Sequence, residues 1–273
     1  MPIAKLGDVD IAYEVTGEGD PVLLVAGLGG SAGYWAPNVA ALSRNCRVIL
    51  HDHRGTGGSS RFEGRYSVEG MADDLLRLMD HLEIDRAHLV GHSTGGAIGQ
   101  VVAANAPDRI ASLVLYASWA VLDGQMEMCL DLRRRILRDG GEAEYHRATP
   151  VFLYPPYYVK DRKAALDQEA ASAASASPPA SILDARVAGI MAFDGRPYLS
   201  RIACPTMVLV AEDDILTPLY SSELLAGGIA GSRLVTVPRG GHALSRTEPD
   251  LFNETIAAFL ADHATAREDV HAA

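Results

Sequence analysis

The chain has 273 residues, of which 48% are hydrophobic, and 24 Lys and Arg against 35 Asp and Glu give it a formal net charge of -11. This length is long for one domain and short for two, and the composition is ordinary for a folded protein with a large core. The acidic balance disfavours nucleic acid and anionic membranes, which bind basic surfaces. We therefore expect a small-molecule substrate, with no nucleic-acid and no membrane partner.

The three cysteines lie far apart, at Cys46, Cys129 and Cys204, and form no C-x-x-C pair. The sequence therefore predicts neither a disulfide framework nor a zinc site. The first residues contain no apolar signal region, and no run reaches the length of about 18 apolar residues that a membrane helix needs. We expect a cytoplasmic protein, and a homo-oligomer is compatible with the sequence.

Short apolar runs alternate with amphipathic stretches in the first 118 residues. Runs typical of strands lie at 10–15, 21–28, 46–52, 87–92 and 112–118. Helical patterns lie between these runs, at 34–43, at 67–84 and from about residue 93 onward. Strands with little polar alternation, each followed by a helix, predict a parallel sheet that helices cover on both faces.

The pattern changes between residues 119 and 198. A basic helical pattern at 127–141 precedes an aromatic stretch at 149–159, which we interpret as irregular. An alanine- and serine-rich region at 165–194 is interrupted by two prolines, and we expect these to separate two helices, with a flexible linker as the alternative. The whole region predicts a mostly helical insertion above the sheet.

Strand and helix patterns return after the insertion. Strand-like runs lie at 205–212 and 232–238, and an amphipathic helix is predicted at 249–263. Residues 263–273 predict a frayed tail. No internal repeat is visible in the sequence.

One serine lies among glycines directly after a strand-like run. Residues 91–95 read G-H-S-T-G, the pattern G-x-S-x-G, and a helical pattern follows. Glycines let a sharp strand-to-helix turn close, because they have no Cβ atoms. The turn would project the Ser93 hydroxyl above the carboxyl edge of the sheet, near the positive end of the helix. The pattern favours a nucleophilic serine, with a tight packing point as the alternative.

A serine hydroxyl is a weak nucleophile unless a base removes its proton and a third group orients that base. Asp213 and Asp214 end a predicted strand, and His242 lies in a glycine-rich loop after the next strand. Taken singly, the acidic pair could cap a helix and the histidine could be a solvated loop residue. Together with Ser93 they follow the order serine, acid, histidine, which is typical of hydrolases with a nucleophile elbow.

Acyl transfer also needs hydrogen-bond donors for the oxyanion, and loss of one such donor costs about 100- to 1000-fold in rate. Residues 25–31, V-A-G-L-G-G-S, form a glycine-rich segment after a predicted strand. We predict that the backbone N–H groups of Leu28 and Thr94 form the oxyanion hole. A plain turn at this position is the alternative.

Five aromatic residues fall where the oxyanion loop and the helical insertion should meet, namely Trp35, Trp119, Tyr154, Tyr157 and Tyr158. We expect them to wall an apolar substrate pocket, although packing between insertion and core would also place them there. The run Arg133–Arg135 predicts a solvated helix face, with guidance of a substrate carboxylate as the alternative. His51 and His53 have no third ligand nearby, so we expect no metal, and no nucleotide motif points to a cofactor.

The sequence resembles the α/β-hydrolase family over nearly its whole length. Residues 52–59 match the family loop D-x-R-G-x-G-x-S, and G-G-H-A at 240–243 matches its histidine loop. The resemblance implies an α/β fold with a mostly parallel central sheet, built from residues 1–118 and 199–262, and a small helical cap at 119–198.

The resemblance also selects one of the two aspartates. In this family the acid lies four residues before a proline, here Pro218, which implies Asp214 rather than Asp213. Adjacent side chains of an extended segment face opposite sides, so only one of the pair can readily face His242. The implied catalytic triad is Ser93, Asp214 and His242.

A narrower similarity lies in the segments GLGGSAGYWAP, DHRGTG, FLYP, DDILTP and SSELLA, which resemble the pyrimidine-utilisation branch of aminoacrylate or carbamate hydrolases. Some members of that branch lack the elbow serine, whereas this chain has Ser93. We predict a cofactor-independent serine hydrolase that forms an acyl-enzyme from an ester, a lactone, a carbamate-like compound or a carbonyl compound cleaved at a C–C bond. A small-molecule receptor without turnover, or a lyase or perhydrolase on the same fold, are the alternatives.

Overall fold

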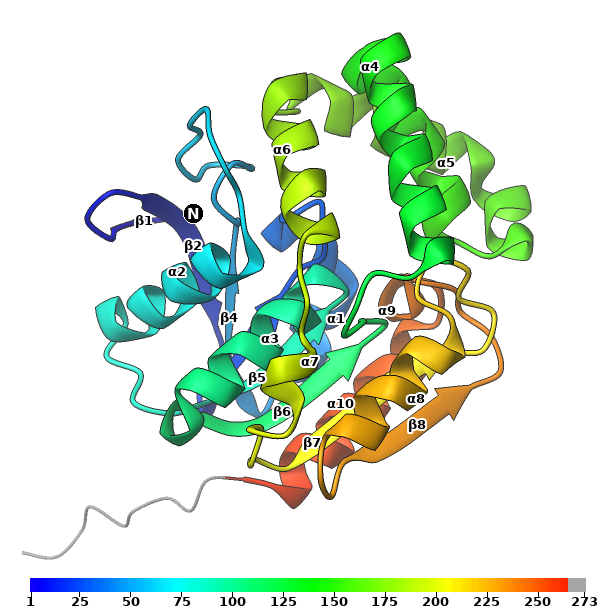
Figure 1. Cartoon of the computed structure of the whole chain (residues 1–273). Helices are drawn as coiled ribbons and strands as arrows, with labels where there is room; N and C mark the ends of the chain where they lie inside the picture. The colour runs from blue at the N-terminus through cyan, green and yellow to red at the C-terminus, as the bar shows by residue number, and fades with distance from the viewer. Residues whose placement is uncertain (265–273) are drawn as a thin grey trace, which may run out of the picture.

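The computed structural model describes residues 1–264 (Figure 1). Within them, eight strands form one sheet in the order β1-β2-β4-β3-β5-β6-β7-β8. Their bounds are β1 Ile3–Lys5, β2 Asp10–Thr16, β3 Asp20–Val25, β4 Cys46–His51, β5 Ala87–His92, β6 Ile110–Tyr116, β7 Thr206–Ala211 and β8 Arg233–Val237. β2 runs antiparallel to β1 and β4, and the pairs from β4 to β8 are parallel. The mostly parallel sheet of the predicted α/β-hydrolase fold is confirmed.

Helices cover both faces of this sheet (Figure 1). The bounds are α1 Ala36–Leu42, α2 Val68–His81, α3 Thr94–Asn105, α7 Arg196–Leu199, α8 Leu219–Gly228, α9 Leu244–Thr247 and α10 Pro249–Asp262, with 3-10 turns η1 Ala32–Trp35 and η2 Pro107–Arg109. Alternate residues of β3 show how the sheet serves two cores. Leu23 and Val25 join the core under α2, α3 and α8, whereas Val22 and Leu24 join the core under α1 and α10. Successive side chains of a strand point to opposite faces, so a strand buried on both faces is apolar throughout.

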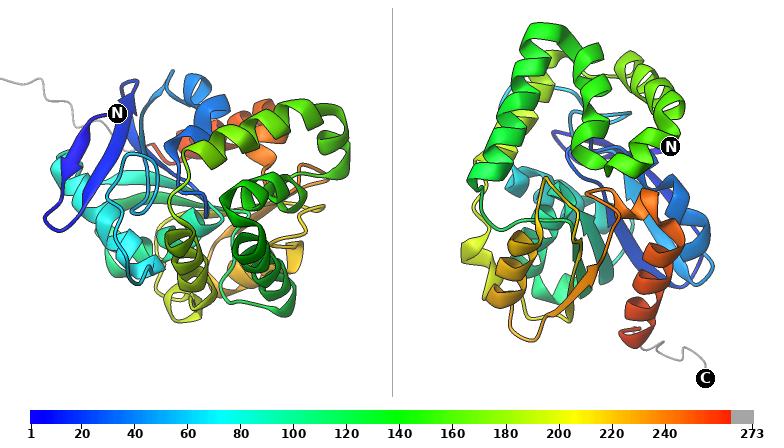
Figure 2. Two further views of the ribbon diagram at one scale, coloured as in Figure 1. Left: turned by 90° about the horizontal axis from the view of Figure 1, so that it is seen from above. Right: turned by 90° about the vertical axis from the view of Figure 1, so that its right-hand side faces the viewer.

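Three helices between β6 and β7 lie over the carboxyl ends of the parallel strands (Figure 2). They are α4 Gly124–Leu153, α5 Pro156–Ser175 and α6 Ala180–Met191, and we refer to them as the cap helices because of this position. α4 packs against both α5 and α6. The domain boundaries at 119 and 198 stay a prediction.

The helix α4 is bent at Gly141, where φ is 74° and ψ is -172°. These angles lie outside the helical region, and a positive φ is readily adopted by glycine alone. The bend folds the second half of α4 back toward its first half. Side chains that a straight helix would hold far apart therefore meet.

The structure differs from the sequence-based expectation in several places. The aromatic stretch 149–159 is helical on both sides of Tyr154–Pro155, because proline is tolerated in the first turn of a helix and α5 begins directly after this break. The short strand β1 and the weakly periodic helix α8 were not predicted. Of the predicted tail, residues 265–273 lie outside the described part of the chain.

Within the described part, no helix is long and apolar enough to span a membrane.

Candidate active site

Ser93 lies at the turn between β5 and α3. Its backbone has φ 52° and ψ -114°, a conformation that residues with a side chain rarely adopt. The flanking glycines explain why the turn can close: a Cβ on Gly91 would lie 2.3 Å from the Gly95 carbonyl oxygen, and one on Gly95 would lie 2.1 Å from that of Val25. The pattern G-x-S-x-G is therefore a steric requirement here. The turn places Ser93 in the wall of a cavity.

Asp214 and His242 meet above the ends of β7 and β8. Both side chains are buried, and His242 Nδ1 lies 2.9 Å from Asp214 Oδ2. The backbone N–H groups of Leu216 and Thr217 donate to Asp214 Oδ1 at 2.8 and 3.0 Å, and the Thr217 hydroxyl donates to Oδ2 at 2.9 Å. These bonds fix the carboxylate in one orientation. Donation from Nδ1 leaves Nε2 of His242 as the ring nitrogen that can accept a proton.

Asp213, the neighbouring aspartate, contacts the loop of His242 through the backbone. Asp213 Oδ1 accepts a hydrogen bond of 2.7 Å from the backbone N–H of Gly241 and so holds the loop that carries His242. The carbonyl of His242 itself accepts from the Tyr116 hydroxyl at 3.0 Å and from His92 Nε2 at 2.9 Å. The histidine backbone is thus fixed from two sides.

The predicted oxyanion donors border the same cavity as Ser93. The N–H of Gly30 donates to the carbonyl of Gly27 at 2.9 Å and closes a tight turn. In a trans peptide the N–H points opposite to the C=O, so the N–H of Leu28 points away from this turn. Thr94 is the first residue of α3, and its N–H has no acceptor within the helix. The oxyanion role of the two amides stays a prediction.

The buried side chain of Arg186 joins cap helix α6 to the glycine-rich loop at residues 25–31. Its guanidinium donates to the carbonyl of Leu28 at 2.9 Å and also to the carbonyl of Arg54. A Cβ on Gly30 would lie 2.6 Å from this guanidinium, so glycine lets the loop approach. Burial lowers the pKa of Arg186 to about 10, which keeps the group charged at neutral pH. No local sequence pattern indicates this contact.

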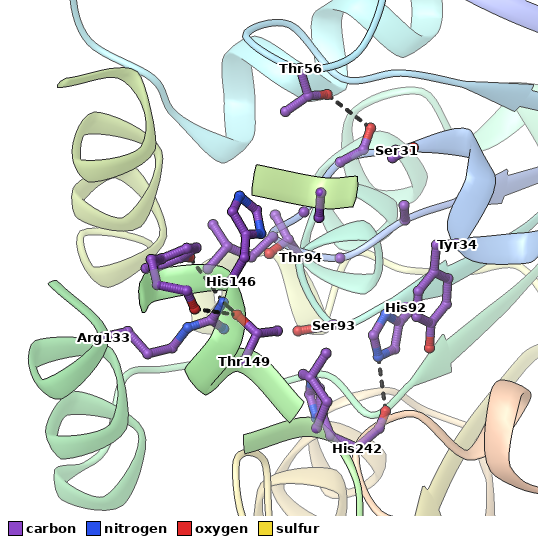
Figure 3. Close-up of a pocket in the computed structure, with 18 of the residues that line it drawn as sticks. Ser31, Tyr34, Thr56, His92, Ser93, Thr94, Arg133, His146, Thr149 and His242 are labelled. Carbon is purple, nitrogen blue, oxygen red and sulfur yellow. Dashed lines mark hydrogen bonds between the residues drawn. The ribbon is translucent and has the colours of Figure 1, made fainter. Parts of the chain in front are cut away.

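A cavity of about 410 Å³ extends from Ser93 and His242 to the cap helices. This volume is within the range of about 300–1,000 Å³ that is usual for small-molecule sites. Figure 3 shows Ser93 near its middle, with His242, His92 and Tyr34 on one side and residues of α4 on the other. Of the five predicted pocket aromatics, Trp119 and Tyr154 line it.

The other three predicted aromatics lie elsewhere. Trp35 is fully buried in the core between sheet and α10, with its ring 5.9 Å from that of Phe252. Tyr157 is 37% exposed, and Tyr158 stacks on Tyr154 at 5.0 Å without lining the cavity. Consecutive helical residues point in different directions, so one helix end cannot direct all its tyrosines into one pocket.

Tyr34 and His92, which line the cavity, are among the residues that the sequence analysis missed. The rings of Tyr34 and His92 stack with centroids 4.4 Å apart and an interplanar angle of 5°. Burial lowers the pKa of His92 well below its ordinary value, and the nearby His242 lowers it further, so His92 is neutral. His92 occupies the variable position before Ser93, and its place in the pattern G-x-S-x-G was the available signal.

The part of the cavity bounded by α4, which we call the cap end, contains Arg133, Tyr145, His146 and Thr149. The expectation of a solvated face for Arg133–Arg135 is wrong for its first member, because the bend at Gly141 covers Arg133. Arg133 is 6% exposed, whereas Arg135 is exposed to solvent. Burial, followed by the charge of Arg133, lowers the pKa of His146.

His51 and His53 are buried beside the glycine-rich loop at residues 25–31, with ring centroids 5.1 Å apart. Burial lowers the pKa of His51 to about 4. His53 Nδ1 lies 3.5 Å from the Arg186 guanidinium, a positive neighbour that disfavours a metal cation. Within residues 1–264, no group of three metal-ligating side chains converges.

The model of the α/β-hydrolase fold family matches residues 20–249 of this chain. The chain belongs to the α/β-hydrolase family. Among curated relatives, the protein named "Putative carbamate hydrolase RutD" of Azorhizobium caulinodans is 43% identical over 96% of this chain and 99% of its own length. This similarity puts the chain close to the RutD branch of the family.

Solved structures of the family have the same architecture. The enol-lactonase of Burkholderia xenovorans LB400 matches with a TM-score of 0.87 at 28% identity, over 95% of this chain and 100% of that one. A thermophilic esterase of Thermogutta terrifontis, described with malate bound, matches with a TM-score of 0.84 at 30% identity, over 96% and 97% of the two chains.

Proposed function

We propose that this α/β-hydrolase cleaves a small carbonyl substrate through a covalent acyl-enzyme on Ser93, without a cofactor. The observation that carries the proposal is the 2.9 Å contact between His242 Nδ1 and Asp214 Oδ2, next to the cavity that Ser93 lines. A buried carboxylate that orients an imidazole beside a strained serine is the arrangement that activates a hydroxyl nucleophile.

In the first half of the reaction, His242 Nε2 takes the proton of the Ser93 hydroxyl as Oγ attacks the carbonyl carbon. The proton then passes to the leaving group as its bond to that carbon breaks. Asp214 stabilises the imidazolium that exists between these two transfers. In the second half, a water molecule gives its proton to His242, its oxygen attacks the acyl carbon, and the Ser93 hydroxyl is restored with release of the acid.

The negative charge that develops on the carbonyl oxygen needs donors in fixed positions. The N–H groups of Leu28 and Thr94 are the proposed donors. The turn at Gly27–Gly30 and the first turn of α3 supply both without a side chain. Because the backbone does not rearrange when the charge appears, such donors stabilise the transition state more than the substrate.

The relatives suggest several leaving groups. Carbamates, enol-lactones and carboxylic esters, the substrates that the names of RutD, the enol-lactonase and the esterase indicate, all contain a carbonyl with a heteroatom leaving group. The proposed chemistry accommodates each, and a C–C bond next to a carbonyl as well. Selection among them would then depend on the walls of the cavity.

A fluorophosphonate probe tests the proposal, because it reacts with activated serine hydroxyls. We expect labelling of wild-type protein at Ser93, none in Ser93→Ala, and turnover of at least one member of an ester, lactone and carbamate panel. Labelling at another residue would contradict the assignment of Ser93. Absence of both labelling and turnover would favour a small-molecule receptor, and turnover without hydrolysis would favour a lyase or perhydrolase.

A further inference from the structure

The cap end of the cavity contains a buried cation without a counter-ion. Arg133 is 6% exposed, and within the described residues 1–264 it forms no ion pair with a carboxylate. Its terminal nitrogen donates to the hydroxyls of Tyr145 at 2.9 Å and Thr149 at 3.2 Å, while its Nε has no hydrogen-bond partner. The charge is therefore held by neutral groups alone.

Such an arrangement is costly for the folded protein. A buried charge is normally paired, and a buried N–H without an acceptor loses the hydration that it had in the unfolded chain. The faces of Tyr145 and Phe152, with centroids 4.8 and 5.6 Å from the guanidinium carbon, compensate in part. The remaining cost is explained if a ligand supplies the missing anion.

The bend in α4 creates this site. Arg133 and Tyr145 are 12 residues apart, which in a straight helix corresponds to about 18 Å along the axis. The left-handed conformation of Gly141 folds the second half of the helix back, so that the tyrosine hydroxyl meets the guanidinium. Because this hydroxyl accepts from Arg133, its own proton can be donated to a second acceptor. The Tyr145 hydroxyl thus lies directly beside the Arg133 guanidinium.

The other charged side chains of the cavity neutralise each other. Arg246 and Glu169 both line the cavity, and they form an ion pair of 2.9 Å. Among the described lining residues, Arg133 is therefore the one arginine without an acidic partner. Figure 3 shows Arg133 and Thr149 on the opposite side of Ser93 from His92 and Tyr34.

We propose that the substrate carries a carboxylate, remote from the bond that is cleaved, and that Arg133 and Tyr145 bind this carboxylate while the scissile carbonyl lies at Ser93. The planar guanidinium matches the geometry of a carboxylate and binds it by charge-assisted hydrogen bonds. This inference rests on the proposed function and narrows it from carbonyl compounds in general to carboxylate-bearing esters, lactones or carbamates.

Matched ester pairs test the proposal. The 4-nitrophenyl half-esters of succinate, glutarate and adipate each have a neutral isostere, in which an isopropyl group replaces the carboxylate: the 4-nitrophenyl esters of 4-methylpentanoate, 5-methylhexanoate and 6-methylheptanoate. After subtraction of spontaneous hydrolysis, we expect kcat/KM of wild-type protein to favour the charged member at least tenfold for one or more chain lengths. A ratio near one at all three lengths would overturn the proposal.

Substitution of Arg133 tests whether this residue causes the preference for the charged ester. We expect Arg133→Met to lower the ratio of charged to neutral kcat/KM at least tenfold, and Arg133→Lys, which keeps the charge without the planar fork, to give an intermediate ratio. Arg135→Met is the matched control, since this exposed residue is two positions away on the same helix and should leave the ratio unchanged. A preference that survives Arg133→Met would also overturn the proposal.

A binding experiment separates this inference from the proposed mechanism. Isothermal titration of Ser93→Ala protein with glutarate, succinate and adipate requires no turnover, and we expect binding that the additional Arg133→Met change weakens at least tenfold. If wild-type protein hydrolyses no ester, the acyl-enzyme mechanism fails while this titration still decides the carboxylate site. Equal affinity with and without Arg133, or no binding of any dicarboxylate, would then overturn the site.

Discussion

The two ends of the cavity differ in how their charged side chains are paired. We call the end at Ser93 and His242, whose ring contacts Asp214, the triad end. At the triad end, Asp214 receives hydrogen bonds on both oxygens and the carbonyl of His242 receives two. At the cap end, Arg133 has hydroxyl partners and an Nε–H with none. The hydrogen bonds around Asp214 and His242 thus exist before a substrate arrives, as a preorganised catalytic site requires. At the second end, the proposal above assigns the missing counter-ion of Arg133 to a carboxylate of the substrate.

The largest effect expected at the triad end comes from Ser93→Ala. Loss of the attacking oxygen should reduce kcat by about 10⁶-fold, the cost of removing the nucleophile of a serine protease. Steady-state kinetics with the best ester of the panel measures this change, and thermal unfolding verifies the fold. Retention of a tenth of the wild-type kcat would mean that the reaction does not require the Ser93 hydroxyl.

The next effect distinguishes two adjacent aspartates. Asp214→Asn should lower kcat by about 10⁴-fold, because the amide no longer stabilises the imidazolium and favours the wrong tautomer of His242. Asp213→Asn is the matched control: its carboxamide oxygen can still accept from Gly241, so little more than local stability should change. Measurement of kcat for both variants with one ester shows which aspartate acts on His242. The reverse outcome would exchange the roles of the two residues.

A smaller effect is expected from substitution of Arg186, which joins cap helix α6 to the carbonyl of Leu28. Arg186→Met removes the donor to the carbonyl of Leu28 and should lower kcat by about 10- to 100-fold, less than full loss of an oxyanion donor. KM should change little, because the oxyanion forms only in the transition state.

Two variants control for a loss of folding in that experiment. Arg186→Lys can donate one of the two bonds and should restore part of kcat. Arg134→Met, on the cap helix α4 with its partner Asp184 on α6, should change neither parameter. Equal losses in kcat and in thermal stability, without rescue by lysine, would indicate a structural role alone.

The smallest effect expected is that of metal removal. Prolonged treatment with EDTA, followed by gel filtration, should leave kcat within experimental error, because the proposed chemistry assigns every proton transfer and all charge stabilisation to protein groups. Atomic absorption of the treated protein verifies the depletion. A loss of activity that zinc or magnesium restores would contradict cofactor independence.

Local sequence patterns contain more information on the triad end than on the cap end, for a physical reason. The strands, the elbow at Ser93 and the order of acid and histidine follow from local rules of periodicity and steric fit. The burial of Arg133 depends on a bend eight residues farther along, and the contact of Arg186 with Leu28 joins residues 158 positions apart. No local pattern contains either of these contacts.

The pocket aromatics illustrate the same limit. Trp119 and Tyr154 line the cavity, but Trp35 faces the core and Tyr157 faces solvent. Which way each ring points depends on the phase of its helix or turn, and an error of one residue in a helix rotates a side chain by about 100°.

The bend at Gly141 has a consequence for how this protein could acquire new substrates. Arg133, Tyr145 and Thr149 belong to one continuous segment that leaves and re-enters the sheet at neighbouring strands, β6 and β7. A Cβ on Gly141 would meet nothing within 4 Å, so glycine is required there by backbone conformation and not by lack of space. Exchange of this one segment between relatives would transfer the complete set of recognition groups in a single genetic event and leave the triad in place.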